Sequence, residues 1–226
     1  MTAALQASDL YRFYRSEEDE VLALRGVSLS VSSGEMVAVV GPSGSGKSTL
    51  LACLAGLDEP SGGVVRIGGR RLSHRPEAER AAVRAAGIGT VFQAGNLFDH
   101  LTVAQNVAFA QSLVPRRAAR ARRGPTTTDS LIEQLGLEHR AGAYPGELSG
   151  GETARAGVAV ALANDPAVVL ADEPTGELDR ASESRVLALL TGLAAQGRAV
   201  LVVTHSAAVT SAADRVLRLH DGGLAA

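Results

Sequence analysis

An octapeptide, GPSGSGKS at residues 41–48, constrains the fold more than any other feature of the chain. It matches G-x-x-x-x-G-K-[ST] in full and follows a short apolar run, EMVAVV at residues 35–40, that is typical of a buried parallel strand. Glycines allow backbone conformations that a β-carbon forbids, so the N–H groups of such a loop can turn inward and surround an anion. The sequence therefore predicts a strand, a phosphate-binding loop and a helix in succession.

Each side chain of this loop has an expected role towards a nucleoside triphosphate with Mg²⁺. We expect Lys47 to reach the β- and γ-phosphates, Ser48 to bind Mg²⁺ through its hydroxyl, and Thr49 to contact the α- and β-phosphates. The remaining phosphate contacts are expected from the loop itself, at Gly41, Ser43, Gly44, Ser45 and Gly46. A glycine-rich turn without a ligand is the alternative, and the full match in this context argues against it.

Composition also distinguishes this loop from the rest of the chain, because Lys47 is the only lysine among 22 basic residues and the others are arginines. The net charge of −2 and the absence of Trp argue against a general nucleic-acid binder. A single cysteine, Cys53, excludes an internal disulfide and is expected in the core. The arginine-rich stretch at residues 115–124 is expected to be a solvated helix face, with an anion-binding patch as the alternative.

A second apolar run, VVLADE at residues 168–173, ends in two carboxylates. Parallel strands present their carboxyl ends to the ligand crevice, so Asp172 and Glu173 are expected beside the phosphate loop. Asp172 is expected to hold Mg²⁺ through water, and Glu173 to polarise the water that attacks the γ-phosphate. A strand that simply ends in polar residues is the alternative.

Strand and helix patterns alternate along the chain, except for a mainly helical stretch at about residues 94–164. Strands are expected at residues 5–14, 23–31, 35–40, 62–69, 88–92, 167–171, 199–203 and 215–220. Helices are expected at residues 47–56, 76–86 with Pro76 in its first turn, 103–113, 150–163, 180–195 and 207–213. This pattern indicates one α/β domain over residues 1–226, with a core formed by residues 1–93 and about 165–226 and a helical insertion between them.

The motif LSGGE at residues 148–152 lies between the two phosphate-site motifs. With it, nearly the whole chain resembles the nucleotide-binding subunits of ABC transporters, and most closely the group that contains MacB, LolD and FtsE-like subunits. The resemblance implies a P-loop ATPase fold, with a mainly parallel core sheet, an antiparallel β-subdomain and an inserted helical subdomain. It also implies ATP as the nucleotide and Mg²⁺ as its metal.

The resemblance assigns further site residues by their match to family motifs. Tyr14 matches the aromatic residue that stacks on adenine, Gln93 the glutamine that touches Mg²⁺, and His205 a catalytic switch histidine. Asp179 lies in the matching D-loop. For the neighbouring Tyr11 and Phe13, which alternation places on the opposite face of the strand, core packing is the expectation.

The signature residues Ser149, Gly150 and Gly151 start a helix with a hydroxyl and N–H groups, which suits a γ-phosphate. In a single chain this would be a second phosphate site with no obvious ligand. The family arrangement gives it one, because two subunits face head to tail and enclose two ATP molecules. We therefore expect a homodimer.

Several positions depart from the family pattern. Thr153 and Ala154 replace glutamines after the signature, and Val160 stands where arginine is common. Glu177 adds charge to the D-loop, and Ser206 replaces an aspartate after His205. None of these changes removes a phosphate-binding, metal-binding or water-activating group. They bear on turnover and on the dimer interface.

The expected function is an ATPase subunit that drives a separate transmembrane permease from the cytoplasmic side of the membrane, as an exporter or mechanical complex of the MacB or LolD type. The sequence has no run of about 18 apolar residues and no export signal. The permease is expected to dock near residues 93–105. An FtsE-like ATPase that gates a cell-wall process is the main alternative, and a nucleic-acid or ribosome ATPase is a weaker one.

Overall fold

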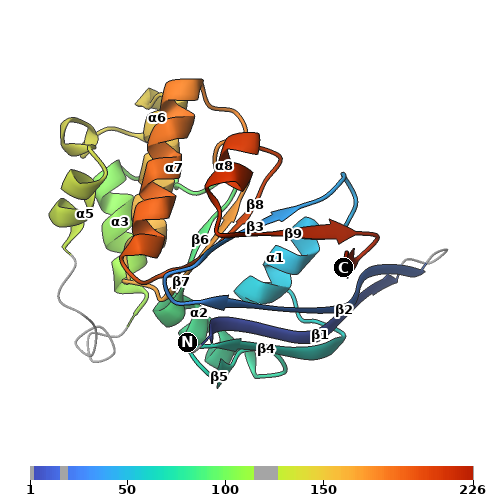
Figure 1. Ribbon diagram of the computed structural model, residues 1–226. Helices are drawn as coiled ribbons and strands as arrows, with labels where there is room; N and C mark the ends of the chain where they lie inside the picture. The colour runs from blue at the N-terminus through green and yellow to red at the C-terminus, as the bar shows by residue number, and fades with distance from the viewer. Residues whose placement is uncertain (1–2, 16–19, 115–126, 226) are drawn as a thin grey trace.

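The computed structural model describes residues 3–15, 20–114 and 127–225, which form two β-sheets with helices around them (Figure 1). The smaller sheet is antiparallel, in the order β2-β1-β4-β5. Its strands are β1 (Ala3–Arg15), β2 (Glu20–Ser32), β4 (Gly62–Ile67) and β5 (Arg70–Arg71). The two long strands form a hairpin that extends well beyond β4, since the pairing of β1 with β4 ends at Tyr11.

The larger sheet has the order β10-β9-β3-β8-β7-β6 and is parallel except for β10. Its strands are β3 (Met36–Val40), β6 (Ile88–Val91), β7 (Val168–Asp172), β8 (Ala199–Val203), β9 (Arg215–His220) and β10 (Gly223–Leu224). Short runs of β-branched and other apolar residues suit strands that are buried on both faces. Because β3, β8 and β7 are neighbouring parallel strands, their carboxyl ends lie together at one edge of the sheet, where the phosphate loop follows β3.

Helices cover both faces of the larger sheet. They are α1 (Lys47–Ala55), α2 (Glu77–Gly87), α3 (Val103–Ser112), α5 (Thr128–Gln134), α6 (Gly150–Leu162), α7 (Arg180–Ala195) and α8 (Ala207–Ala212). In Figure 1, α1 lies between the two sheets, and α3, α5, α6 and α7 gather on the opposite face of the larger one. Among the described residues, no helix combines the length and the apolar character needed to cross a membrane.

The hydrophobic core is divided by the larger sheet into two clusters. Val37 and Val39 of β3 face the first cluster, which joins α1 to the antiparallel sheet. Val200 and Val202 of β8 face the second cluster, formed with α3, α5, α6 and α7. Cys53 is buried in the first cluster, and burial raises the pKa of its thiol to about 12, so the expectation of a core cysteine is confirmed.

The expected fold class is confirmed, and most elements lie where the sequence pattern predicts them. The expectation for Pro76 was wrong by one position: it is the residue before α2 and has an extended ψ of 144°. The strands β5 and β10 were not expected, since two residues are too short to show alternation. The arginine-rich stretch at residues 115–124 lies entirely outside the described part of the chain.

Candidate nucleotide site

A cavity of about 850 Å³ opens at the carboxyl ends of β3, β7 and β8. It brings together predicted residues from five separate segments of the chain. These are Tyr14, Ser43, Gly44, Gly46, Lys47, Ser48, Thr49, Gln93, Asp172, Glu173 and His205. The walls between them are completed by residues that sequence reasoning did not single out, at 21–23, 25 and 221–222.

The phosphate loop has the conformation that its glycines permit. Gly44 and Gly46 have φ values of 78° and 100°, which side-chain-bearing residues rarely adopt. A β-carbon on Gly41 would lie 2.1 Å from the carbonyl oxygen of Leu219, so this position leaves no room for one. Because α1 begins at Lys47 directly after the loop, its free N–H groups and its positive end face the cavity.

Lys47 is 8% exposed and bends back over its own loop. Its ammonium donates hydrogen bonds to the carbonyl oxygens of Gly41 at 2.8 Å and Pro42 at 2.9 Å. Ser45 is a buried residue of the loop, and its carbonyl oxygen accepts the N–H of Gly222 at 3.1 Å. The turn between β9 and β10 thus supports the loop from below.

Asp172 and Glu173 follow β7 directly. Burial raises the pKa of Asp172, and the neighbouring charge of Glu173 adds to the effect while Lys47 opposes it. Glu173 has a φ of 44° and donates its backbone N–H to the carbonyl oxygen of Val203 at 2.9 Å. This left-handed turn directs its carboxylate toward His205, across the end of β8.

The two oxygens of the Glu173 carboxylate differ in their hydrogen bonding. Oε2 accepts the backbone N–H of His205 at 3.1 Å. Oε1 is buried, has no hydrogen-bond donor among the described residues, and lies 3.5 Å from Nε2 of His205. A buried carboxylate oxygen without a donor is costly, so this atom is ready to accept a hydrogen bond from a ligand or water.

Oxygen ligands for a divalent cation converge on the same cavity, from Ser48, Gln93 and Asp172. Hard cations prefer such oxygen donors, and Mg²⁺ is usually held by one or two carboxylates together with substrate phosphates. The described residues contain no cluster of three or more His, Cys, Asp or Glu residues that would bind a metal without a substrate. The available donors therefore fit a metal that arrives with the nucleotide.

Gln93 lies in a loop that Asn96 holds in place. The side chain of Asn96 accepts the N–H of Phe92 at 2.7 Å and donates to its carbonyl oxygen at 2.6 Å. This side-chain clamp ends β6 and lets the chain turn toward the cavity.

Tyr14 lines the cavity and is 40% exposed. Its hydroxyl donates to Oδ2 of Asp58 at 2.6 Å, and the guanidinium carbon of Arg12 lies 4.4 Å from the centre of its ring. The expectation that Tyr11 and Phe13 are core residues was wrong, because they are 42% and 39% exposed. They lie where the hairpin leaves the rest of its sheet, so little is available to cover them.

The signature residues do not line this cavity. Ser149 caps α6: its hydroxyl accepts the N–H of Glu152 at 3.3 Å, and Glu152 accepts the N–H of Ser149 at 2.8 Å. Gly151 packs so closely that a β-carbon would lie 2.5 Å from Oγ of Ser182. Within one chain, the helix start formed by Ser149, Gly150 and Gly151 therefore lies outside the cavity of that chain.

Asp179 is likewise absent from the cavity and caps α7. It accepts the N–H groups of Ala181 at 2.9 Å and Ser182 at 3.0 Å, and the hydroxyl of Ser182 at 2.7 Å. The Ser182 hydroxyl and these N–H groups lower the pKa of Asp179. Its evident role in the single chain is to start α7.

The missed residues of the site share one property: they depend on distant contacts. Arg12 and Asp58, which fix Tyr14, are separated by 46 residues in sequence. Gly222 has a φ of 75° and pairs with Ser45 from the far end of the chain. A glycine after Asp221 signals a turn, but nothing local says that this turn lies under the phosphate loop.

Known proteins are similar to this chain in both sequence and fold. The ABC transporter family pattern matches residues 24–176. The macrolide export ATP-binding/permease protein MacB of Salmonella paratyphi A is 42% identical over 98% of this chain and 34% of its own length, so the chain spans about a third of that relative. The lipoprotein-releasing system ATP-binding protein LolD of Chromohalobacter salexigens is 43% identical, over 97% of this chain and 92% of its own.

Solved structures of ABC transporter cassettes are also similar to this chain. A bacterial ABC transporter cassette solved as a dimer is 34% identical with a TM-score of 0.86, over 98% of this chain and 97% of that one. The same cassette in a post-hydrolysis state, bound to ADP and Pi, has a TM-score of 0.87 at 33% identity over the same shares. On these grounds the chain belongs to the ABC transporter family, as one of its ATP-binding cassettes.

Proposed function

We propose that this cassette hydrolyses MgATP as a head-to-tail dimer and so drives a transmembrane permease on a separate chain. One observation carries the proposal: Lys47, Asp172 and Glu173 face a common cavity, whereas the signature at 149–151 lies outside it. Two copies in head-to-tail arrangement would bring the signature of each chain to the cavity of the other. Each nucleotide would then be enclosed by both chains, with Asp179 near the seam.

In the proposed reaction, the side chains that line the cavity act on the nucleotide, and Lys47 changes its hydrogen-bond partners. The ammonium of Lys47, at the mouth of the loop, moves from two carbonyl oxygens to the β- and γ-phosphates. Oε1 of Glu173 accepts a hydrogen bond from the attacking water, and His205 beside it contacts the γ-phosphate and holds this arrangement. Ser149 and the N–H groups of Gly150 and Gly151 from the other subunit stabilise the charge that develops.

Mg²⁺ bound by Ser48, Gln93 and Asp172 would neutralise charge on the phosphate oxygens. Tyr14 would stack on the adenine, since it lines the same cavity as the phosphate loop. The N–H groups of Ser43, Gly44, Gly46 and the helix start at Thr49 would surround the phosphates. Gly41 and Ser45 would support the loop, since a β-carbon on Gly41 has no room and the N–H of Ser45 already donates to the carbonyl oxygen of Pro42 at 3.2 Å. We propose the whole of residues 1–226 as one such unit, with about 94–164 as its helical part.

A docking surface for the permease is proposed beside the Gln93 loop. Phe98, Phe109 and Leu113 are 51%, 43% and 58% exposed, and the rings of Phe98 and Phe109 meet edge to face at 5.3 Å. Buried Asn106 fixes this loop by hydrogen bonds to both backbone groups of Phe98. Exposed aromatic side chains on a rigid support are typical of protein interfaces.

The names of the relatives favour transport over gating of a cell-wall process, because they concern macrolide export and lipoprotein release. We therefore propose an exporter or lipoprotein-release type of complex, with the cassette bound through its permease to the cytoplasmic side of the membrane. Nucleic acid is not expected as a partner.

Hydrolysis is tested with Glu173→Gln, which keeps the shape of the side chain but removes the acceptor strength of Oε1. We expect phosphate release from MgATP to fall about 10²-fold or more while ATP binding persists. Glu133→Gln, at an exposed position of α5, is the matched control and should keep the wild-type rate. An unchanged rate in Glu173→Gln would contradict the proposal.

A further inference from the structure

The ring of Tyr14 is held by two residues that no family motif assigns. Arg12 and Asp58 form a fork, with Nε to Oδ2 and Nη2 to Oδ1 both at 2.8 Å. The Tyr14 hydroxyl donates to Oδ2 of the same carboxylate at 2.6 Å, and the Arg12 guanidinium covers the ring at 4.4 Å. Three side chains thus form one closed unit, which we call the tyrosine clamp.

The hydrogen bonds within the tyrosine clamp stabilise the negative charge of Asp58. Burial opposes the charge of Asp58, but hydrogen bonds from Tyr14 and Arg12 outweigh it and lower the pKa of Asp58. Arg12 and Asp58 each have side chains that are 24% exposed, so solvent screens them only in part. Because Arg12 covers one face of the ring, only the opposite face remains for a planar ligand.

The position of Asp58 ties the tyrosine clamp to the phosphate loop. Its backbone N–H donates to the carbonyl oxygen of Ala52 in α1 at 3.2 Å, and α1 begins with Lys47. One helix of nine residues therefore separates the carboxylate that holds Tyr14 from the lysine expected at the phosphates. A rigid helix sets the distance between the two.

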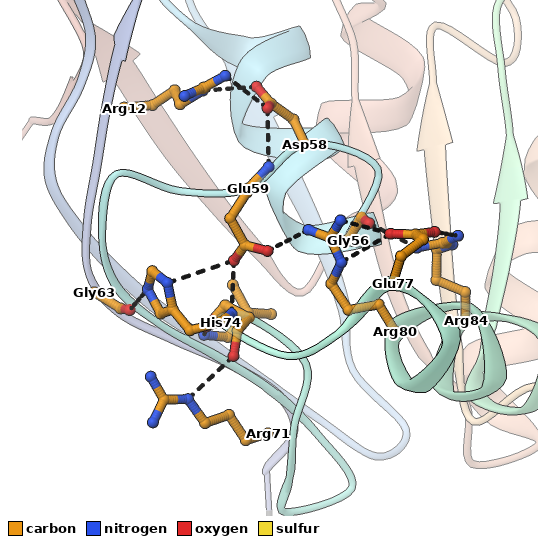
Figure 2. A network of polar contacts seen from close by, with 12 residues as sticks. Arg12, Gly56, Asp58, Glu59, Gly63, Arg71, His74, Glu77, Arg80 and Arg84 are labelled. Carbon is orange, nitrogen blue, oxygen red and sulfur yellow. Dashed lines mark hydrogen bonds and ion pairs between the residues drawn. The ribbon is translucent and has the colours of Figure 1, made fainter.

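A polar network extends from the tyrosine clamp and braces this end of α1 (Figure 2). The N–H of Glu59 donates to Oδ1 of Asp58, and the Glu59 carboxylate binds Arg80 and the backbone N–H of His74. Glu77 joins Arg80 to Arg84, whose guanidinium donates to the carbonyl oxygen of Gly56 at 2.8 Å. Gly56 ends α1, so α2 holds the same helix end that carries Asp58.

We propose that Arg12 and Asp58 are positioning residues for the nucleotide base: they hold Tyr14 in advance as a stacking platform at a fixed distance from the phosphate loop. Holding a platform in advance improves affinity, because the ordering cost does not fall on the binding step. This inference rests on the proposed function, in which the base stacks on Tyr14. It assigns to Arg12 and Asp58 an effect that depends on the base and not on the phosphates.

The test compares MgATP with magnesium tripolyphosphate, which has the phosphates but no base. Dissociation constants are measured by calorimetry at equal ionic strength for wild type, Tyr14→Ala, Asp58→Asn and Arg12→Gln. For MgATP we expect a loss of about 10-fold in Tyr14→Ala and about 3- to 10-fold in the other two. Tripolyphosphate binding should stay within about twofold throughout.

A double variant separates positioning from a general structural role. In the Tyr14→Ala background, Asp58→Asn should cause no further loss of MgATP affinity, since its effect passes through the ring. Glu79→Gln, at an exposed position of α2 outside the network, is the matched control and should bind both ligands as wild type does.

The contrary outcomes distinguish a failure of the positioning role from a failure of the proposed function. Equal weakening of both ligands in Asp58→Asn, or a full effect in the Tyr14→Ala background, would overturn the positioning role and leave the proposed function intact. Unchanged MgATP affinity in Asp58→Asn and Arg12→Gln would do the same. A wild-type protein that binds neither ligand would instead refute the proposed function.

Discussion

Two glycines show how strongly surroundings decide what a single residue does. Gly89 in β6 is buried, and a β-carbon there would lie 2.3 Å from the carbonyl oxygen of Ala161 in α6 and 2.9 Å from Cγ of Pro166. A β-carbon on Gly192 in α7 would meet no atom within 4 Å beyond its chain neighbours and the nearby backbone of its own helix. Both have ordinary negative backbone angles, so the space beside them is the main difference.

We expect Gly89→Ala to lower the free energy of unfolding by about 1–3 kcal/mol, because β6 and α6 must move apart. Gly192→Ala should raise it by about 0.5–1 kcal/mol, since alanine restricts the unfolded chain and favours a helix. Chemical denaturation of both variants beside the wild type measures the two effects. Equal changes of the same sign would contradict this reading of the packing.

The lone lysine belongs to the same scale. Lys47 is nearly buried, and its ammonium approaches two carbonyl oxygens across the phosphate loop. A compact ammonium fits between them, whereas a guanidinium is wider and planar. In a chain that otherwise uses arginine for every basic residue, this geometry gives a physical reason for the exception.

At the scale of the element, the start of α6 depends on a carboxylate. Hydrogen bonds from the Ser149 N–H, the Arg140 guanidinium and the Ser149 hydroxyl lower the pKa of Glu152 from its ordinary value of 4.5 to about 2. His139 lies 3.4 Å from the same carboxylate. Folding therefore favours the ionised form, and the stabilisation is complete above the unfolded pKa and lost as the pH falls through the folded one.

The corresponding prediction concerns Glu152→Gln. At neutral pH we expect the variant to be less stable than wild type, and we expect the difference to narrow as the pH falls from 4.5 toward about 2. Denaturant unfolding over this range measures the difference, with Glu133→Gln at an exposed position of α5 as the control. A difference that stays constant below 4.5 would argue against an ionised Glu152 in the cap.

Departures from the family pattern also find their reasons in single elements. Ser206 caps α8 by accepting the N–H of Val209 at 3.3 Å, and its hydroxyl donates to Glu183 at 2.6 Å. An aspartate here would place a second carboxylate against Glu183. Val160 packs against the second core cluster, and the Thr153 hydroxyl donates to the carbonyl oxygen of Ser149 at 3.0 Å.

These elements show what could be predicted from the sequence. Helix α7 and strands β8 and β9 lie exactly at the predicted residues because periodicity and caps are local signals. The predicted end of α1 is confirmed by Gly56 in the left-handed conformation. Helices α3 and α6 begin at the predicted residues, directly after the caps Thr102 and Ser149. Local rules miss the two-residue strands, which only pairing partners create.

The candidate site also has parts set by local sequence signals and parts set by distant contacts. Its phosphate loop and acidic strand end were predictable because each is a contiguous motif after a buried strand. The partners of Tyr14 and the turn under Ser45 were not, since they come from residues far away in sequence. The exposed positions of Tyr11 and Phe13 also depend on where the hairpin outruns its sheet, which alternation does not reveal.

At the scale of the whole molecule, the position of the signature makes a prediction about assembly. Ser149 starts α6 and lies outside the cavity that holds Lys47 and Glu173. If each active site combines the cavity of one chain with the signature of another, a defect in either part removes activity from a pure dimer. In a two-fold dimer, both composite sites then carry the same defect.

Mixing two inactive variants should therefore restore activity. Lys47→Ala spoils the cavity and Ser149→Arg spoils the signature, so a mixed dimer has one site with both defects and one site with neither. Random pairing of equal amounts should give about a quarter of the wild-type rate of phosphate release, because half of the dimers are mixed and each has one intact site. Ser149→Arg alone should still bind MgATP, since its phosphate loop is untouched. Mixed dimers that form, as tagged chains can demonstrate, but stay inactive at every ratio would contradict the head-to-tail arrangement.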